Sequence, residues 1–186
     1  MLDCNGPDEA SCLKQESSAR NKFILDATAG FREIWFNKKH PNTVYLDQKA
    51  ECEPTEIGDF RNLNQFSDES FRLIIFDPPH IVQKSCYNGA ALIRKYGVLE
   101  AETWQSDFKK AFSEFYRVLK PYGILLFKWT NLQVSSPEVL KLTDWHPLLY
   151  QVTSKKAQKI SHKNTTRNLR VMWFCFMKIP EEGKPC

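Results

Sequence analysis

The amino-acid sequence predicts an α/β fold: a doubly wound, mostly parallel sheet of seven strands with an antiparallel hairpin at one edge. Short apolar runs typical of buried strands alternate with helical patterns through most of the chain, which indicates a parallel sheet covered on both faces. Near the end, two apolar runs are joined by a basic loop, which favours an antiparallel pair. A chain of 186 residues suits one domain, expected at 23–179, with an N-terminal arm at 1–22 and a tail at 180–186.

The first four strands are expected where apolar runs end at an acidic residue or a turn. A helix is expected between the first two strands, at 31–39, because Pro41 follows and helices tend to stop before a proline. A loop or short helix then runs through Pro54. The four expected strands are 23–25, 43–46, 57–60 and 71–76.

The second half contains the clearest helix, expected at 101–119. Its apolar residues recur at spacings of three and four and form one face: Trp104, Phe108, Ala111, Phe112, Phe115 and Leu119. The run Lys120-Pro121-Tyr122-Gly123 breaks this helix. The remaining expectations are a loop at 87–97, a strand at 124–129, a short helix and turn at 140–147, and strands at 150–152 and 169–179.

Composition excludes several classes of protein. Hydrophobic residues make up 42% of the chain and the net charge is +4, which is globular and mildly basic, so an anionic partner is permitted but not required. No apolar run approaches membrane-spanning length and no signal peptide is evident. The six cysteines contain no C-x-x-C pair, so we expect reduced thiols in a cytoplasmic protein and no metal. A metal site using Cys4 and Cys12 is the minor alternative.

The run Asp77-Pro78-Pro79-His80 follows the strand expected at 71–76 and is the most informative stretch of the chain. Each proline fixes its own φ and lacks an N–H, and each biases the preceding residue towards an extended conformation. The result is a stiff corner that presents one carboxylate and bare carbonyls. Hydrogen-bond acceptors held in place, with no N–H donors beside them, suit the binding of an amino group. The same residues could also make an ordinary turn.

Four acidic residues end successive predicted strands, and this order resembles the class I methyltransferases that bind S-adenosylmethionine. The acids are Asp26, Asp47, Asp59 and Asp77. The resemblance implies a Rossmann-like sheet, covers 23–179, and extends to the turn Lys120-Pro121-Tyr122-Gly123. Its first motif corresponds to Ile24-Leu25-Asp26-Ala27-Thr28-Ala29-Gly30, in which Gly30 is the one glycine of the two or three that are usual.

The resemblance also implies how each cofactor-binding residue would act. The turn Asp26, Ala27, Thr28, Ala29 and Gly30 would pass close to the methionine part, with Asp26 facing the ammonium. Asp47 would accept the ribose hydroxyls. Asp59 would accept the adenine amino group, and Phe60 would lie beside the base or simply pack in the core.

The corner itself resembles the catalytic motif of amino-methyltransferases that modify adenine N6 or cytosine N4. Asp77 and the carbonyl of Pro78 would accept the two N–H groups, Pro79 would stiffen the corner, and the fourth position usually stacks on the base. Here that position is His80, which stacks over less area than tyrosine or could cap a loop. A protein amine, a small amine or an inactive binding partner are the alternative functions.

Nucleic acid is the expected partner, with DNA first and RNA second, and a homodimer or a partner subunit is left open. Large members of the family carry a separate target-recognition domain, for which this chain has no room. Basic loops would contact phosphates instead, unless they are simply solvated, and Trp129 could pack rather than bind. The expected substrate-binding residues are Lys84, Tyr87, Arg94, Lys128, Trp129, Lys155, Lys163 and Arg167.

Overall fold

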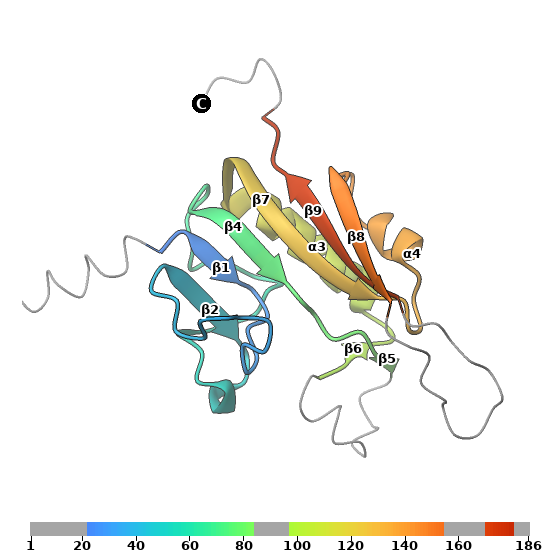
Figure 1. The fold of residues 1–186 in the computed structure, drawn as a ribbon, viewed down its shortest axis with the longest axis horizontal. Coiled ribbons are helices and arrows are strands. Elements are labelled where there is room, and N and C mark those ends of the chain that lie inside the picture. Colours follow the sequence, from blue (N-terminus) through green and yellow to red (C-terminus); the bar gives the residue numbers. More distant parts are fainter. Residues whose placement is uncertain (1–21, 84–96, 155–169, 181–186) are drawn as a thin grey trace, which may run out of the picture.

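The computed structural model describes residues 22–83, 97–154 and 170–180. Its main feature is a seven-stranded sheet in the order β3-β2-β1-β4-β7-β9-β8 (Figure 1). This confirms the predicted α/β fold class. The strands are β1 (Ile24–Asp26), β2 (Thr43–Asp47), β3 (Glu56–Ile57), β4 (Phe71–Phe76), β7 (Leu119–Thr130), β8 (Leu149–Ser154) and β9 (Arg170–Met177).

The five strands from β3 to β7 are parallel, and the last two form the predicted antiparallel edge. β1 lies between β2 and β4, with Ile24 opposite Thr43 on one side and Leu73 on the other. β9 runs antiparallel to both β7 and β8. The carboxyl ends of β1, β2, β4 and β7 therefore meet at one edge of the sheet, where open parallel sheets bind ligands.

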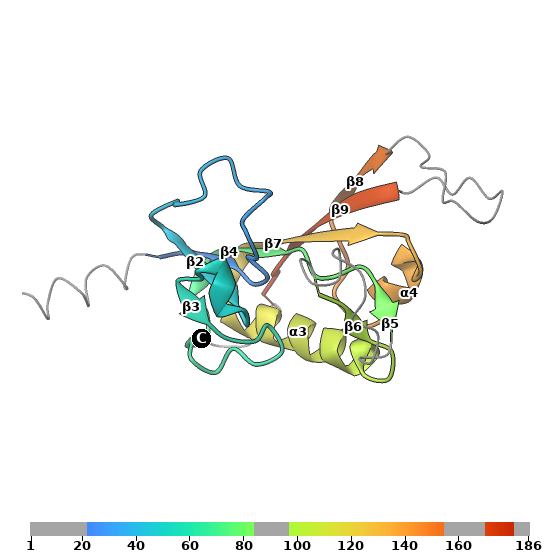
Figure 2. The same cartoon turned by 90° about the horizontal axis from the view of Figure 1, so that it is seen from below.

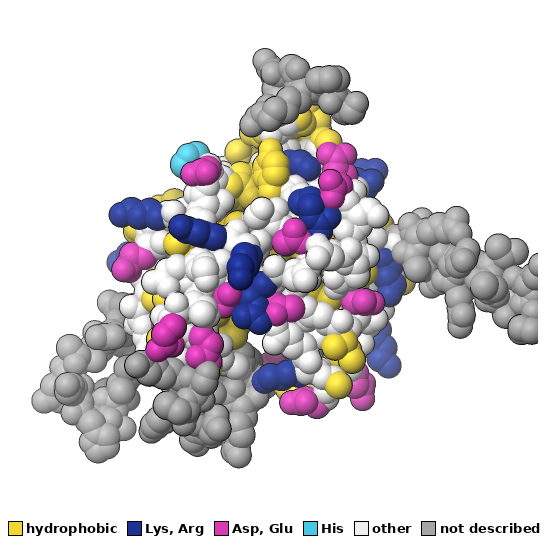
Figure 3. All heavy atoms as spheres, turned by 180° about the vertical axis from the view of Figure 1, so that it is seen from behind, with side chains coloured by type: hydrophobic (Ala, Val, Ile, Leu, Met, Phe, Trp, Pro, Cys, Tyr) yellow, Lys and Arg dark blue, Asp and Glu magenta, His cyan; other side chains and the backbone are white. Residues whose placement is uncertain are grey.

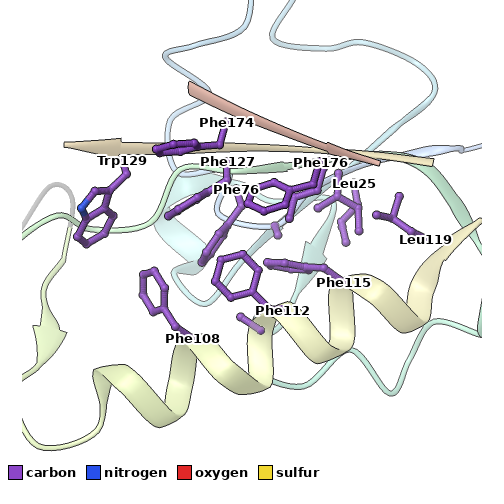
Figure 4. Close-up of a cluster of buried hydrophobic side chains, with 14 of the residues drawn as sticks. Leu25, Phe76, Phe108, Phe112, Phe115, Leu119, Phe127, Trp129, Phe174 and Phe176 are labelled. Carbon is purple, nitrogen blue, oxygen red and sulfur yellow. The ribbon is translucent and has the colours of Figure 1, made fainter. Parts of the chain in front are cut away.

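One long helix, α3 (Trp104–Val118), covers one face of the sheet (Figure 2). Its predicted apolar face is confirmed, since Phe108, Phe112 and Phe115 are buried against the strands. These rings interleave with aromatic side chains of the sheet such as Phe76 and Phe127 (Figure 4). Burying this many aromatic rings dominates the energetics of a small core.

The helix expected at 31–39 is absent, and this segment is an irregular loop between β1 and β2. Arg32 has a left-handed φ of 56°, which interrupts a right-handed helix. Side chains replace the helical hydrogen bonds: the Arg32 guanidinium donates to the carbonyl of Lys38 at 3.0 Å, and the Lys38 ammonium donates to the carbonyl of Phe31 at 3.1 Å. The loop rises on the side of the sheet opposite to α3 (Figure 2).

Other boundaries differ from expectation for local reasons. The third strand is Glu56–Ile57 rather than 57–60, because Asp59 turns back to bridge Asn62. β7 already begins at Leu119, so the expected break at 120–123 lies within the strand. Tyr122 has a φ of 61° there, and a Cβ on Gly123 would lie 2.8 Å from the carbonyl oxygen of Lys120. The turn therefore bulges the strand and requires glycine.

Four short elements complete the described structure. They are η1 (Ala50–Cys52), α4 (Ser136–Leu140) and the paired strands β5 (Val82–Gln83) and β6 (Leu99–Glu100). The sequence predicted neither β5 nor β6. It also misplaced the last helix, which ends at Leu140 instead of beginning there. Ser135 fixes the start of that helix, because its side chain and Glu138 form a capping box.

The α3 side of the molecule shows positive and negative side chains interspersed (Figure 3). The described residues of that face therefore present charges of mixed sign.

None of the described helices is long and apolar enough to cross a membrane. The N-terminal arm except Lys22 and most of the tail, together with the expected loop at 87–97 except Gly97, lie outside the described residues.

Candidate active site

The turn after β1 is tied to both neighbouring strands. Its backbone donates from Ala27 to the carbonyl of Ile75 on β4 and from Ala29 to the carbonyl of Leu46 on β2, each at 2.9 Å. The Thr28 hydroxyl accepts the N–H of Asp77 at 2.9 Å. The turn and the proline corner, which the sequence treated as separate motifs, therefore contact each other directly.

Asp26 is buried at the base of this turn, with 1% of its surface exposed. Its carboxylate accepts the indole N–H of Trp35 at 2.6 Å and the backbone N–H of Thr28 at 3.3 Å. Burial raises the pKa of Asp26 to about 7, although these two hydrogen bonds oppose the rise. In this structure Asp26 braces the loop from inside, and Trp35, which the sequence did not single out, is its partner.

Asp47 lies at the end of β2 and contacts the same turn from the other side. One carboxylate oxygen accepts the N–H of Gly30 at 2.8 Å, and the other accepts the N–H of Lys49 at 2.9 Å. Gly30 has a φ of 47°, and a Cβ placed on it would meet nothing within 4 Å. The turn therefore opens onto free space at the carboxyl edge of the sheet, beside a carboxylate that keeps unused lone pairs.

Asp59 and Phe60 follow β3 and are both partly buried. The Asp59 carboxylate is paired with Arg61, whose Nε lies 2.9 Å from each carboxylate oxygen. Arg61 also contacts Asp107 at the start of α3 at 3.2 Å. The Phe60 ring packs on Phe76 with a centroid distance of 5.2 Å. The packing alternative for Phe60 is thus observed, and Asp59 already has a strong partner within the chain.

Asp77 follows β4 and lies between a lysine and a histidine. The Lys128 ammonium lies 2.7 Å from Oδ2, and the His80 Nε2 lies 3.3 Å from Oδ1. Burial opposes ionisation of Asp77, but the hydrogen bond from His80 and the charge of Lys128 outweigh it, so the pKa of Asp77 lies below its usual value. The carboxylate is therefore ionised at neutral pH, and its side chain is 20% exposed.

The two prolines leave carbonyls without donors at this corner. Pro78 is buried, and within the described residues no group donates to its carbonyl. A Cβ on Gly97 would lie 3.4 Å from Pro79, so the returning chain borders the corner. Beyond it, Val82 donates its N–H to the Gln133 side chain at 2.5 Å, which fixes β5 to the segment after β7.

His80 packs against Trp129, which lies behind the corner. Their rings meet edge to face with a centroid distance of 5.2 Å. Trp129 is fully buried and donates its indole N–H to the carbonyl of Val134. It therefore packs in the core, as the alternative prediction had it, and does not line the substrate side. The Nδ1 atom of His80 is buried and has no partner among the described residues.

Several predicted substrate-binding residues lie outside the described residues: Lys84, Tyr87, Arg94, Lys155, Lys163 and Arg167. Cys4 and Cys12, the minor alternative for a metal site, lie outside them as well. Within residues 22–83, 97–154 and 170–180, no group of three or more histidine, cysteine, aspartate or glutamate side chains could hold a metal ion.

Comparison with known proteins identifies the architecture. No protein-family model matches the chain, and no curated protein matches it. Solved structures do match: an S-adenosylmethionine-dependent methyltransferase from Methanosarcina mazei covers 97% of this chain and 100% of its own, with 13% identity and a TM-score of 0.52. The chain has a Rossmann-like methyltransferase fold.

A second solved structure supports the same fold. The 1,6-didemethyltoxoflavin N1-methyltransferase of Burkholderia thailandensis, solved with bound 1,6-didemethyltoxoflavin and S-adenosylhomocysteine, covers 92% of this chain and 77% of its own. It is 12% identical, with a TM-score of 0.50. Identities this low establish the methyltransferase fold alone, so residue roles rest on the geometry described above.

The acceptor groups of this chain fit S-adenosylmethionine at its ribose end. Asp47 offers carboxylate lone pairs beside the open turn at Gly30, which is what a diol requires. At the ammonium and adenine ends of the cofactor, the structure differs from the roles that the sequence resemblance implied. Asp26 points into the protein and Asp59 is held by Arg61, so neither carboxylate is free for the ammonium or the adenine without rearrangement.

Proposed function

We propose that this protein is an S-adenosylmethionine-dependent methyltransferase that acts on an exocyclic amino group of a nucleic-acid base. Adenine N6 or cytosine N4 in DNA is the first choice, and RNA is the second. The observation that carries the proposal is the ionised carboxylate of Asp77, a residue that follows a central strand and whose backbone N–H is held by Thr28 of the cofactor turn. The methyltransferase fold supports the same assignment.

The acceptors at the corner match what an exocyclic amine needs. Such an amine is a poor nucleophile because its lone pair is delocalised into the ring. If the Asp77 carboxylate and the Pro78 carbonyl each accept one N–H, the nitrogen is drawn towards tetrahedral geometry and its lone pair becomes available. The lowered pKa of Asp77 keeps it ionised, so it accepts a hydrogen bond without needing to lose a proton first.

The cofactor would supply a methyl group already activated on a sulfonium, so no metal is required. In the overall exchange the S–CH₃ bond breaks, leaving a neutral thioether, an N–CH₃ bond forms, and the amine releases one proton to water. Asp47 would hold the ribose, and the turn from Ala27 to Gly30 would lie along the methionine part. Thr28 links the cofactor turn to the proline corner, because its hydroxyl accepts the backbone N–H of Asp77.

Lys128 would orient the carboxylate during this step. It binds Oδ2 at 2.7 Å, whereas among the described residues Oδ1 has the longer contact to His80 at 3.3 Å. Oδ1 is therefore the oxygen better placed to take an additional N–H, since each carboxylate oxygen has more than one acceptor position. His80 would border the target base with its ring edge-on to Trp129.

A small heterocyclic nitrogen is the second candidate substrate. The structural neighbour from Burkholderia thailandensis methylates N1 of 1,6-didemethyltoxoflavin, and it matches this chain at a TM-score of 0.50. A protein amine is a further alternative. An inactive binding partner is less well supported, because Asp77 is kept ionised rather than neutral.

The test is methyl transfer from labelled donor to a panel of single-stranded DNA, duplex DNA, RNA and peptide. Wild type is compared with Asp77→Ala and with Asp144→Ala, which removes an acid remote from the corner in sequence. We expect label in DNA or RNA with wild type and Asp144→Ala, and none with Asp77→Ala. Label in peptide alone would contradict the nucleic-acid assignment, and undiminished transfer by Asp77→Ala would contradict the mechanism.

A further inference from the structure

A pocket of about 290 Å³ lies away from the proline corner. It is lined by Lys22, Arg32, Lys39, His40, Pro41, Thr43, Tyr45 and Thr55. Thr43 begins β2 and Asp47 ends it, so the pocket reaches the opposite end of that strand, about 13 Å along it. Side chains alternate between the two faces of a strand. Leu46 of β2 packs in the core with α3, so Thr43 and Tyr45 point to the other face. The pocket therefore lies on the sheet face opposite to the helix.

The charges of this pocket have one sign. Three of the lining side chains are the cations Lys22, Arg32 and Lys39, and none of the eight lining residues is acidic. Within the described residues no carboxylate pairs with Lys22 or Lys39. By contrast, Arg61 and Arg117 are matched to acids, and the α3 side of the molecule mixes both signs (Figure 3). An uncompensated cluster of cations favours an anion.

Among the described residues, Arg32 is fixed in position without an acidic partner. Its guanidinium donates to the carbonyls of Lys38 and Glu53 and lies over the Tyr45 ring, 4.2 Å from the centroid. Its Nε is buried without a partner among the described residues. A guanidinium that is held by carbonyls and an aromatic ring keeps its full positive charge, which suits recognition of a phosphate.

The loop that contributes Arg32 and Lys39 also exposes large apolar side chains. Phe36 is fully exposed at 109%, Phe31 is 45% exposed and Ile34 is 37% exposed. This loop replaces the helix expected at 31–39, and these three side chains, unlike Trp35, are not turned onto the sheet. Aromatic rings beside a cationic track are the arrangement that binds single-stranded nucleic acid, because bases stack on the rings while cations hold the phosphates.

We infer that the pocket and the loop at 31–40 form a second nucleic-acid contact, in which the pocket holds a backbone phosphate and Phe36 stacks on an unpaired base. The inference rests on the proposed nucleic-acid substrate and adds a site that the Asp77 corner does not include. It assigns single-stranded or flipped-out regions as the preferred form of the substrate. The contact anchors the strand while another nucleotide reaches the corner.

The test is binding of a short fluorescent single-stranded oligonucleotide to the full chain, measured at several salt concentrations. The double variant Lys22→Ala/Lys39→Ala is expected to weaken binding. It should also make the plot of log K against log salt shallower by about 0.7 for each phosphate that is no longer neutralised. Phe36→Ala is expected to raise Kd about tenfold with little change in that slope. Arg32 is left intact because it braces the loop.

Matched controls separate this site from general charge and hydrophobicity. Lys109→Ala/Lys110→Ala removes the same charge from the exposed side of α3, and Leu148→Ala removes another exposed apolar side chain; neither should change Kd more than about twofold. If the pocket and loop variants bind like these controls while wild type methylates nucleic acid, this inference fails and the proposed function stands. If wild type binds no strand and methylates none, both fail.

Discussion

The ammonium of Lys128 on β7 lies 2.7 Å from the carboxylate of Asp77, which directly follows the adjacent strand β4. Phe76 pairs with Phe127 in the parallel register, so the next residue on each strand meets at the carboxyl edge of the sheet. This contact and the one with His80 keep a largely buried carboxylate ionised. The proposed chemistry depends on that charge, and it can be tested through pH.

Replacing Lys128 by methionine should move the acid limb of kcat/KM to higher pH by about one unit. The pKa of Asp77 is lowered in the folded protein, so its acceptor role is present above that pKa and lost as the pH falls through it. Removing the cation raises the pKa, and activity is then lost at a higher pH. A pH profile of methyl transfer measures this, and Lys110→Met is the control. An unmoved limb would mean that Lys128 does not set the charge of Asp77.

Replacing Asp26 by asparagine should stabilise the protein at pH 8 and leave its stability at acidic pH, below the unfolded-state pKa, almost unchanged. Burial raises the folded-state pKa of Asp26 to about 7 from 3.8, so its protonated form is favoured in the native state and stability falls as the pH rises through that window. Asparagine resembles the protonated acid, and the gain at pH 8 should be about 4 kcal/mol. Urea unfolding at the two pH values measures it. A loss of stability at pH 8 would contradict the raised pKa.

Replacing Asp47 by alanine should weaken cofactor binding about 10- to 100-fold, because both the ribose acceptor and the brace on Gly30 are removed. Calorimetry with S-adenosylhomocysteine measures the dissociation constant directly. Glu51→Gln, on the neighbouring short helix η1, serves as the control and should bind as wild type does. Equal affinity in all three proteins would remove Asp47 from the cofactor site.

Replacing Phe112 by alanine should lower the free energy of unfolding by about 3 to 5 kcal/mol. The ring is 2% exposed and packs between α3 and the sheet, against Phe76, Phe127 and Phe176 (Figure 4). Denaturant unfolding measures the loss, and Lys109→Ala on the exposed side of the same helix should change stability by less than about 0.5 kcal/mol. A loss below about 1 kcal/mol for Phe112→Ala would mean that α3 is not packed as described.

The strands and the long helix could be predicted because their signals are local. Apolar runs such as 71–76 and the spacing of Phe108, Phe112 and Phe115 report burial without knowledge of the rest of the chain. The loop at 31–39 could not be predicted in this way. Phe31, Ile34 and Trp35 have helical spacing, but the Trp35 indole is drawn to Asp26, and Arg32 adopts a left-handed φ.

The candidate site was predicted at the level of strand ends, since Asp26, Asp47 and Asp77 all lie at the carboxyl edge. The partners of these acids were missed. Lys128 is 51 residues from Asp77 and Thr28 is 49 residues from it, so their contacts depend on the register of three parallel strands. Arg61 and Asp59 are only two residues apart in the sequence, so their ion pair could have been predicted from the sequence.

The most direct test of the central claim is mass analysis of nucleosides from DNA and RNA incubated with S-adenosylmethionine and either wild type or Asp77→Asn. Asparagine keeps the size of the side chain but loses the charge, and unchanged cofactor binding would show that the site is intact. We predict N6-methyladenine or N4-methylcytosine with wild type and about a hundredfold less, corresponding to about 2.7 kcal/mol of lost stabilisation, with the variant. The same methylated base at the same rate from Asp77→Asn would contradict the account.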